Sequence, residues 1–190
     1  MRGTREQKAE TRERIVDAAG RLFRRHGIDA VGVDAVMHAA GLTHGGFYGH
    51  FPSKEALVAE VAAASLARSA ARWEQISEEA PPEQALGRIV EAYLDPAHVA
   101  NAEGGCVLTT LGPEVARRAD ARPAIAASVR AMAGALERCG AGGEAAALAA
   151  LSMMVGAVVL ARLADSPEFS KTILAAARAA LSSAPQSGRE

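Results

Sequence analysis

The chain has 190 residues, of which 49% are hydrophobic, so it is long enough for one small module and one larger domain with its own core. Its formal net charge of -1 excludes a protein that coats nucleic acid through gross positive charge. The charge is unevenly spread, because residues 1–54 hold nine Lys and Arg against six Asp and Glu, whereas residues 55–190 hold twelve against sixteen. We therefore expect a basic N-terminal unit on a body that does not contact nucleic acid.

Two cysteines, Cys106 and Cys139, provide neither a disulfide framework nor a metal quartet, so the sequence predicts a reducing, cytoplasmic location. The first residues, MRGTREQKAETRER, are too charged for a secretory signal. The stretch from Ala145 to Ala161 contains no charged residue. A membrane-spanning helix needs about 20 strongly apolar residues, so we favour a helix buried on most sides over a membrane span.

The helix-breaking Gly and Pro residues fall between segments rich in Ala, Leu and Arg, which favour helices. Runs of β-branched residues with period two, which indicate strands, do not occur in the sequence. This pattern predicts an all-α protein with about nine helices. Gly27 is expected to cap the first helix, and Pro81-Pro82 to end the long fourth helix. The expected helices cover residues 9–25, 33–40, 44–50, 53–79, 83–94, 106–118, 121–139, 144–164 and 167–182.

The segment from Val33 to Leu57, VDAVMHAAGLTHGGFYGHFPSKEAL, has the spacing of a helix-turn-helix. An apolar face on the first short helix is followed by Gly41 for the sharp turn, Leu42 to fill the angle, and Thr43 to cap the next helix. That second helix is too short and too glycine-rich to be stable by propensity. We expect Phe47 and Phe51, four residues apart, to hold it by packing.

The remaining face of the second helix carries groups that can donate hydrogen bonds or lie close against a DNA groove. Glycines let the backbone approach base edges, and Lys54 adds a full positive charge at the start of the next helix. The sequence therefore predicts contacts to double-stranded DNA. The predicted DNA-binding residues are Thr43, His44, Gly45, Gly46, Phe47, Tyr48, His50 and Lys54.

These residues can also be interpreted as structural residues without a part in DNA binding. The two short helices could be an ordinary packed pair, and Tyr48 could half-bury its ring. His38 fits a solvated face. A metal site built from His38, His44 and His50 is not expected, because these residues lie on different helices and faces without a carboxylate or thiolate helper. No cofactor is expected either.

Residues 27–57 resemble the DNA-binding signature of the TetR family of transcriptional regulators. The matching residues are Ala40-Gly41, Thr43, Gly45, Phe47-Tyr48, His50-Phe51 and Ser53-Lys54-Glu55. The rest of the chain resembles the family by length and helical pattern. One departure is Gly32, because the family usually has Ser or Thr at this position, where it caps a helix and binds phosphate; a Gly cap is still acceptable.

The resemblance implies a homodimeric repressor that binds operator DNA through residues 1–52. It also implies that residues 53–190 bind a small-molecule effector and dimerise through the last two helices. Ala157 and Gly156 would let paired helices approach closely, and residues 175–180 offer a second face of small side chains, although both could be core. By residue type, the candidates for the effector cavity are Trp73, Tyr93, Cys106, Met132 and Met153.

Cys106 lies at a predicted helix N-terminus, where unpaired N–H groups lower the pKa of a thiol. The segment GGCVLTTLGPEVARR resembles one in a TetR subgroup that includes cysteine sensors of oxidants or electrophiles. A buried thiol that acts as a small hydrophobic residue is the plainer alternative. Cys139 could pair with it.

Other classes of protein are less well supported. The sequence contains no G-x-S-x-G, H-E-x-x-H, P-loop or dinucleotide fingerprint, so no enzyme is expected. The alternative that stays open is a helical architectural DNA-binding or interaction protein without a ligand response.

Overall fold

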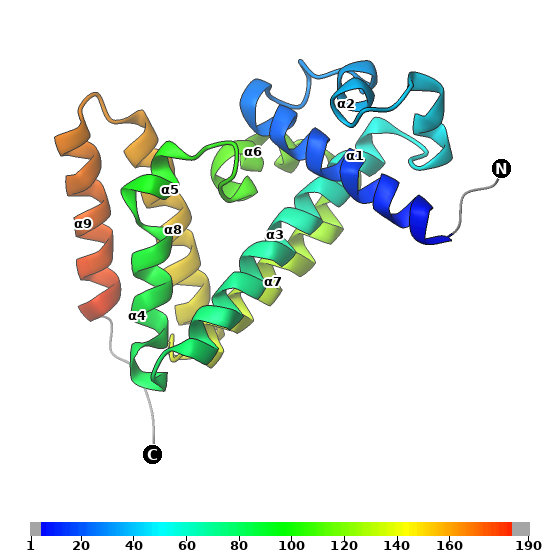
Figure 1. The fold of residues 1–190 in the computed structure, drawn as a ribbon. Coiled ribbons are helices and arrows are strands. Elements are labelled where there is room, and N and C mark those ends of the chain that lie inside the picture. The colour runs from blue at the N-terminus through cyan, green and yellow to red at the C-terminus, as the bar shows by residue number, and fades with distance from the viewer. Residues whose placement is uncertain (1–4, 184–190) are drawn as a thin grey trace.

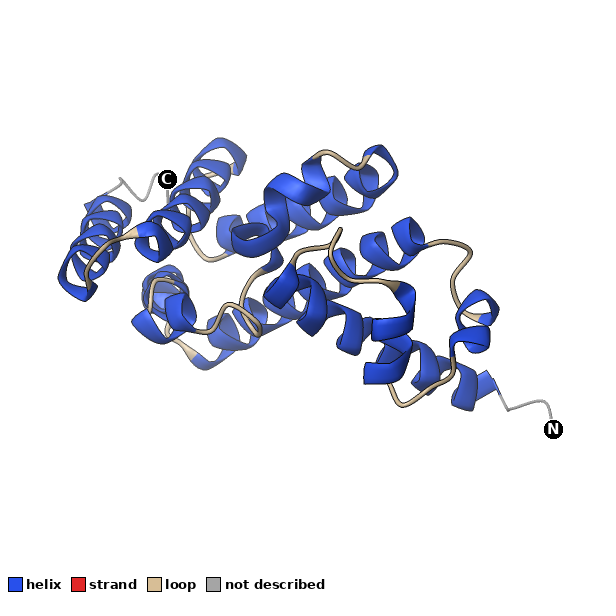
Figure 2. Cartoon of the chain, turned by 90° about the horizontal axis from the view of Figure 1, so that it is seen from above, coloured by secondary structure: helices blue, strands red, loops and turns tan. Residues whose placement is uncertain are grey.

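The computed structural model describes residues 5–183, and these form nine α-helices and two short 3₁₀ helices without a strand in that range (Figure 1). The predicted all-α class is confirmed. Figure 2 shows the same helices joined by short loops. The elements are α1 (Arg5–His26), α2 (Val33–Ala39), η1 (His44–Gly49), α3 (Lys54–Glu79), α4 (Pro82–Tyr93), α5 (Pro96–Ala100), α6 (Val107–Ala116), η2 (Ala119–Ala121), α7 (Arg122–Arg138), α8 (Glu144–Leu163) and α9 (Pro167–Ser183).

The N-terminal head consists of α1, α2 and η1. α1 buries Ile15 and Phe23 on one face, and it ends before Gly27, whose φ of 83° closes the helix as the sequence predicted. Gly41 turns the chain between α2 and η1 with a φ of 70°, a conformation that favours glycine. The expected helix-turn-helix is therefore present.

The long helix α3 joins the head to the body. Its N-cap is Ser53, whose hydroxyl accepts a hydrogen bond from the Ala56 N–H at 3.1 Å. The first turns of α3 bury Leu57 and Val61 in the core shared with α1, and the rest of the helix runs alongside α7 (Figure 1). α3 therefore packs against both parts of the molecule.

α8 corrects one expectation from the sequence. It is long and apolar enough to cross a membrane by composition alone, but we expected it to be buried on most sides, and only 39% of its most apolar window is buried. One face, including Ala157, packs on α7, α9 and α6. The other face exposes Leu160 and Leu163, because within one chain all of these neighbours lie on the same side.

α5 is a short helix that the sequence analysis missed. Asp95 accepts a hydrogen bond from the Ala97 N–H at 2.7 Å, and Pro96 occupies the first helical position. An Asp N-cap followed by Pro is a recognisable helix start, so the signal was present in the sequence. The missed helix matters because it positions His98, described below.

Candidate nucleic-acid interface and ligand cavity

The short helix η1, which is the second helix of the helix-turn-helix, is anchored by two stacked phenylalanines. Phe47 and Phe51 are both fully buried, and their ring centroids lie 5.7 Å apart with an interplanar angle of 26°. The prediction that these rings hold the glycine-rich helix by packing is confirmed. Because Phe47 points into the core, its proposed part in DNA binding is corrected to a supporting one.

The opposite face of η1 is open to solvent. Tyr48 is 67% exposed, and His44, Gly45 and Gly46 are exposed beside it. His44 is close to a carboxylate, since its Nδ1 pairs with Asp34 of α2. An added Cβ at Gly45 would meet nothing within 4 Å, so the helix presents bare backbone on this face.

The remaining predicted contacts lie at the two ends of η1. Thr43 is the N-cap residue, but its side chain makes no capping bond, which corrects that expectation. The reason is that the Gly46 N–H already donates to the Thr43 carbonyl at 3.1 Å, as a 3₁₀ turn requires. His50 and Lys54 are both half-buried at the other end. Burial, followed by the charges of Lys8 and Arg12, lowers the pKa of His50.

Two arginines of α1 donate hydrogen bonds to backbone carbonyls of the helix-turn-helix. Arg12 donates to the carbonyl of His50 and forms a two-pronged pair with Glu60, and its guanidinium lies 4.0 Å from the centre of the Phe51 ring. Arg14 donates to the carbonyl of Ala40 at 2.6 Å. Both therefore bind carbonyls at the C-terminal ends of the two short helices, where positive charge is stabilising.

α6 and the loop before it connect the body to the head. Glu114 of α6 accepts a hydrogen bond from the Ile28 N–H at 2.8 Å, directly after α1. Arg24 of α1 donates to the carbonyl of Glu103, and Arg118 pairs with Asp29. The head is thus attached to the segment that also forms one wall of the cavity described next.

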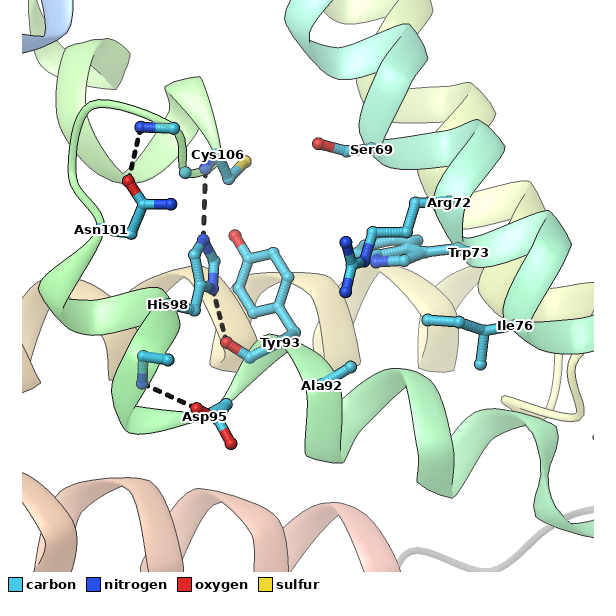
Figure 3. Close-up of a pocket in the computed structure, with 13 residues that line it drawn as sticks. Ser69, Arg72, Trp73, Ile76, Ala92, Tyr93, Asp95, His98, Asn101 and Cys106 are labelled. Atoms are coloured by element: carbon cyan, nitrogen blue, oxygen red, sulfur yellow. Dashed lines mark hydrogen bonds between the residues drawn. The ribbon is translucent and has the colours of Figure 1, made fainter.

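A cavity of about 420 Å³ lies between α3, the end of α4, α5 and the loop before α6 (Figure 3). Three aromatic rings line it. The Trp73 and Tyr93 centroids lie 5.8 Å apart in an edge-to-face arrangement, and those of Tyr93 and His98 lie 4.6 Å apart. This size is within the range of small-molecule sites.

His98 forms hydrogen bonds to two walls of the cavity, at the end of α4 and in the loop before α6. Its Nδ1 lies 2.6 Å from the Tyr93 carbonyl, and its Nε2 accepts a hydrogen bond from the Cys106 N–H at 3.2 Å. This places the proton of the neutral ring on Nδ1. Burial lowers the pKa of His98, and the nearby Arg162 and Arg72 lower it further, while the bond to the Tyr93 carbonyl opposes them.

The loop from Asn101 to Cys106 can fold over His98 only with glycines. A Cβ at Gly105 would lie 2.8 Å from the backbone oxygen of Asn101, closer than real Cβ atoms come. Gly104 donates its N–H to the Asn101 side-chain oxygen at 2.9 Å. The Gly104-Gly105 pair therefore shapes the cavity.

Arg162 of α8 fastens this region to the rest of the body. Its guanidinium donates to the carbonyls of His98 and Val99 at 3.1 and 3.0 Å, and to the Thr109 hydroxyl at 2.8 Å. The bonds join α5 and α6 to α8, the helix with the exposed apolar face.

Of the five candidates for effector binding, the structure brings together Trp73, Tyr93 and Cys106. Met132 is fully buried in the core and Met153 is 40% exposed on α8, so neither lines this cavity. Both were chosen by residue type, which does not determine the side to which a helix residue points. The sequence analysis missed Arg72, His98 and Asn101 as lining residues.

The geometry defines an all-helical protein with a helix-turn-helix head and a body that contains a cavity. Residues 15–61 match the family described as "Bacterial regulatory proteins, tetR family". This match covers the head from Ile15 onward and the first turns of α3, so this part of the chain resembles that family in sequence.

The relatives agree with this resemblance. The chain is 38% identical over 60 residues to the HTH-type transcriptional regulator AcrR of Shigella flexneri, over 32% of this chain and 28% of AcrR. The matches to the curated relatives span about a third or less of those proteins' length, 28–31%.

Solved structures extend the likeness of the fold to the body. The reduced form of NemR from E. coli superposes with a TM-score of 0.76 at 20% identity, covering 88% of this chain and 95% of NemR. SCO4454, a TetR-family transcriptional regulator from Streptomyces coelicolor, gives a TM-score of 0.72 at 22% identity, covering 92% of this chain and 95% of SCO4454. At these identities the likeness establishes the fold alone.

Proposed function

We propose that this protein is a cytoplasmic, sequence-specific DNA-binding transcription regulator, a homodimeric repressor that a small molecule releases. The observation that carries the proposal is the outward face of η1. A short helix exposes His44, Gly45, Gly46 and Tyr48 while two buried phenylalanines hold it from behind. Such a helix can enter the major groove, and Tyr48, His50 and Lys54 can reach phosphates at its edges.

Dimerisation is proposed through α8 and α9. These helices pack on each other, and in the single chain they expose large apolar side chains to solvent. Such exposed side chains are expected on a surface that a second copy of the chain covers. A two-fold dimer would place its recognition helices about 34–36 Å apart, one turn of DNA. The exposed apolar residues are Leu148, Met153, Leu160, Leu163 and Phe169.

Release is proposed to start in the cavity. An effector there would touch α3 and the loop before α6, and both are attached to the head, through the α1–α3 core and through Glu114 and Arg24. The effector must favour the state that does not bind DNA, and a coupling of about 1–3 kcal/mol is sufficient to be measured. If saturating ligands bind but leave operator affinity unchanged, this coupling does not exist.

The same proposal includes an effector that is an electrophile and reacts covalently with Cys106. Cys106 lines the cavity at the N-cap of α6, although only 4% of its surface is exposed. An α,β-unsaturated carbonyl compound that entered the cavity would add to Cys106: the thiol gives up its proton, the sulfur bonds to the β-carbon as the carbon–carbon π bond breaks, and the α-carbon takes up a proton. The test is whether an alkylating agent weakens operator binding of the native protein and not of a Cys106→Ser variant.

The decisive experiment measures binding to the DNA upstream of the protein's own gene, with random DNA of equal length as the control, over a range of salt concentrations. A regulator prefers the upstream DNA, whereas an architectural protein binds both alike and an interaction module binds neither. A monomer that binds its site tightly would contradict the dimer.

A matched pair of variants locates the DNA interface. Lys54→Ala should weaken binding to both DNAs and reduce the slope of log affinity against log salt by about one. Arg130→Ala removes an exposed positive charge on α7, far from η1, and should leave the slope unchanged. If both variants behave alike, Lys54 is not a phosphate contact.

A further inference from the structure

Two groups that can donate hydrogen bonds line the cavity without a partner in the described part of the chain, the buried Tyr93 hydroxyl and the guanidinium of the exposed Arg72. The Tyr93 hydroxyl is buried, and it has no hydrogen-bond partner in the described part of the chain. The Arg72 guanidinium points toward it from α3 (Figure 3), and within residues 5–183 it has neither an ion-pair nor a hydrogen-bond partner. A buried unpaired hydroxyl costs free energy unless a ligand supplies an acceptor.

Most acceptors around the cavity are already in use. Both His98 nitrogens are engaged with the backbone, and the Asn101 side-chain oxygen accepts from Gly104. Asp95 is the one carboxylate among the lining residues. One of its oxygens caps α5 by accepting from the Ala97 N–H, at a helix start that stabilises negative charge. Asp95 is thus engaged at the start of α5, whereas Arg72 is the charged lining residue without a hydrogen bond or an ion pair within residues 5–183.

The apolar part of the cavity is aromatic. Trp73 and Tyr93 stand edge to face with an interplanar angle of 70°, and His98 adds a third ring at 75° to Tyr93. Rings at these angles offer faces and edges on which a flat conjugated molecule packs well. Burial, and then the neighbouring Cys106, raise the pKa of Tyr93 above its ordinary value of 10. A tyrosine hydroxyl is protonated at neutral pH in either case, so it can donate to a ligand.

We propose that the cavity binds a planar aromatic carboxylate, with the carboxylate on Arg72, the ring among Trp73, Tyr93 and His98, and a second oxygen of the ligand accepting from the Tyr93 hydroxyl. The proposal deepens the effector role given to the cavity above and rests on it. It distinguishes this ligand class from aromatic cations, for which Asp95 would be the counter-ion.

The test of charge uses three probes of nearly equal shape: benzoate, neutral benzamide and cationic benzamidinium. Calorimetry gives their affinities, and Trp73, the only tryptophan of the chain, reports binding at the cavity by its fluorescence. Benzoate should bind most tightly. Arg72→Gln should weaken benzoate by roughly tenfold or more and leave benzamide unchanged.

Arg68→Gln is the matched control for charge, because Arg68 lies one turn earlier on α3, pairs with Asp17 and does not line the cavity. This variant should bind benzoate as the native protein does. Tighter binding of benzamidinium than of benzoate would overturn the proposal. So would equal losses of benzoate affinity in the Arg68 and Arg72 variants.

The test of the second oxygen compares benzoate with its hydroxy-substituted isomers. One isomer should bind more tightly than benzoate in the native protein, and Tyr93→Phe should remove this advantage while benzoate itself still binds. No advantage for any isomer would overturn the role of Tyr93. Operator binding without ligand is measured on the same proteins, so a failure of DNA binding is distinguished from a failure of ligand binding.

Discussion

The head and the body of this protein use their buried aromatic residues in different ways. In the head, Phe23, Phe47 and Phe51 are fully buried and pack against one another or against α1. In the body, Trp73 and Tyr93 line a cavity and Phe169 is 53% exposed on α9. The head thus fills its interior to fix the position of one surface, whereas the body leaves space between its helices.

This contrast determines what a substitution should disturb. A closely packed interior without spare volume responds to a lost side chain by losing stability. A substitution in the wall of a cavity also changes the affinity for what enters the cavity. Two different assays, unfolding and binding, therefore separate the two regions.

The largest effect is expected from Phe47→Ala, which should lower the free energy of unfolding by about 3–5 kcal/mol, because it empties the centre of the head. Urea unfolding followed by circular dichroism measures the loss. The neighbouring Tyr48→Ala is the control, and it should cost about 0.5 kcal/mol, since that ring is exposed. Similar losses in the two variants would show that the head is not held from within.

Arg12→Met should come next. Arg12 positions the end of η1 by binding the His50 carbonyl and Glu60, so its loss should weaken operator affinity by roughly tenfold. Arg12→Lys keeps the charge but cannot make the two-pronged pair. If Arg12 positions η1, the Arg12→Lys variant should bind DNA as poorly as the Arg12→Met variant. If Arg12 only contacts phosphate, the Arg12→Lys variant should keep the native affinity and salt slope.

Gly45→Ala tests whether η1 needs a bare backbone against DNA. An added Cβ would meet nothing within 4 Å in the protein, so stability should not fall. Operator affinity should decrease by about 1–2 kcal/mol and sequence preference should change, because the methyl group separates the helix from the bases. Gly49→Ala, where a Cβ meets nothing, is the control, and equal effects at both positions would contradict the predicted approach.

The smallest effect concerns pH. Because the pKa of His98 is lowered by folding, the unfolded chain binds its proton more readily than the folded one. The stability that depends on neutral His98 is complete above its ordinary pKa of 6.5 and is lost as the pH falls through the lower, folded value. Unfolding measured from pH 7.5 to about pH 5 should show a smaller decline in His98→Gln than in the native protein. Equal declines would exclude His98 as the cause.

Much of the head could be predicted from the sequence, because its signals are local. Gly27 and Gly41 close helices in a conformation that favours glycine, and Phe47 and Phe51 share a face by their spacing. The same local rules explain why Ser53 caps α3. They failed at Thr43, because the type of helix that follows decides which N–H is left to cap. The boundary near Pro52 stays a prediction.

The cavity depended on tertiary structure. Arg72, Tyr93 and His98 come from α3, α4 and α5, and no spacing along the chain indicates that they meet. Met132 and Met153 were predicted to line the cavity from their residue type alone. The packing of their helices places Met132 in the core and Met153 on the surface of α8. Helix caps and faces follow from neighbours within about four positions, so the sequence by itself determined the helices and the helix-turn-helix. A cavity is the space that separate helices leave between them, and only their packing decided which side chains face it.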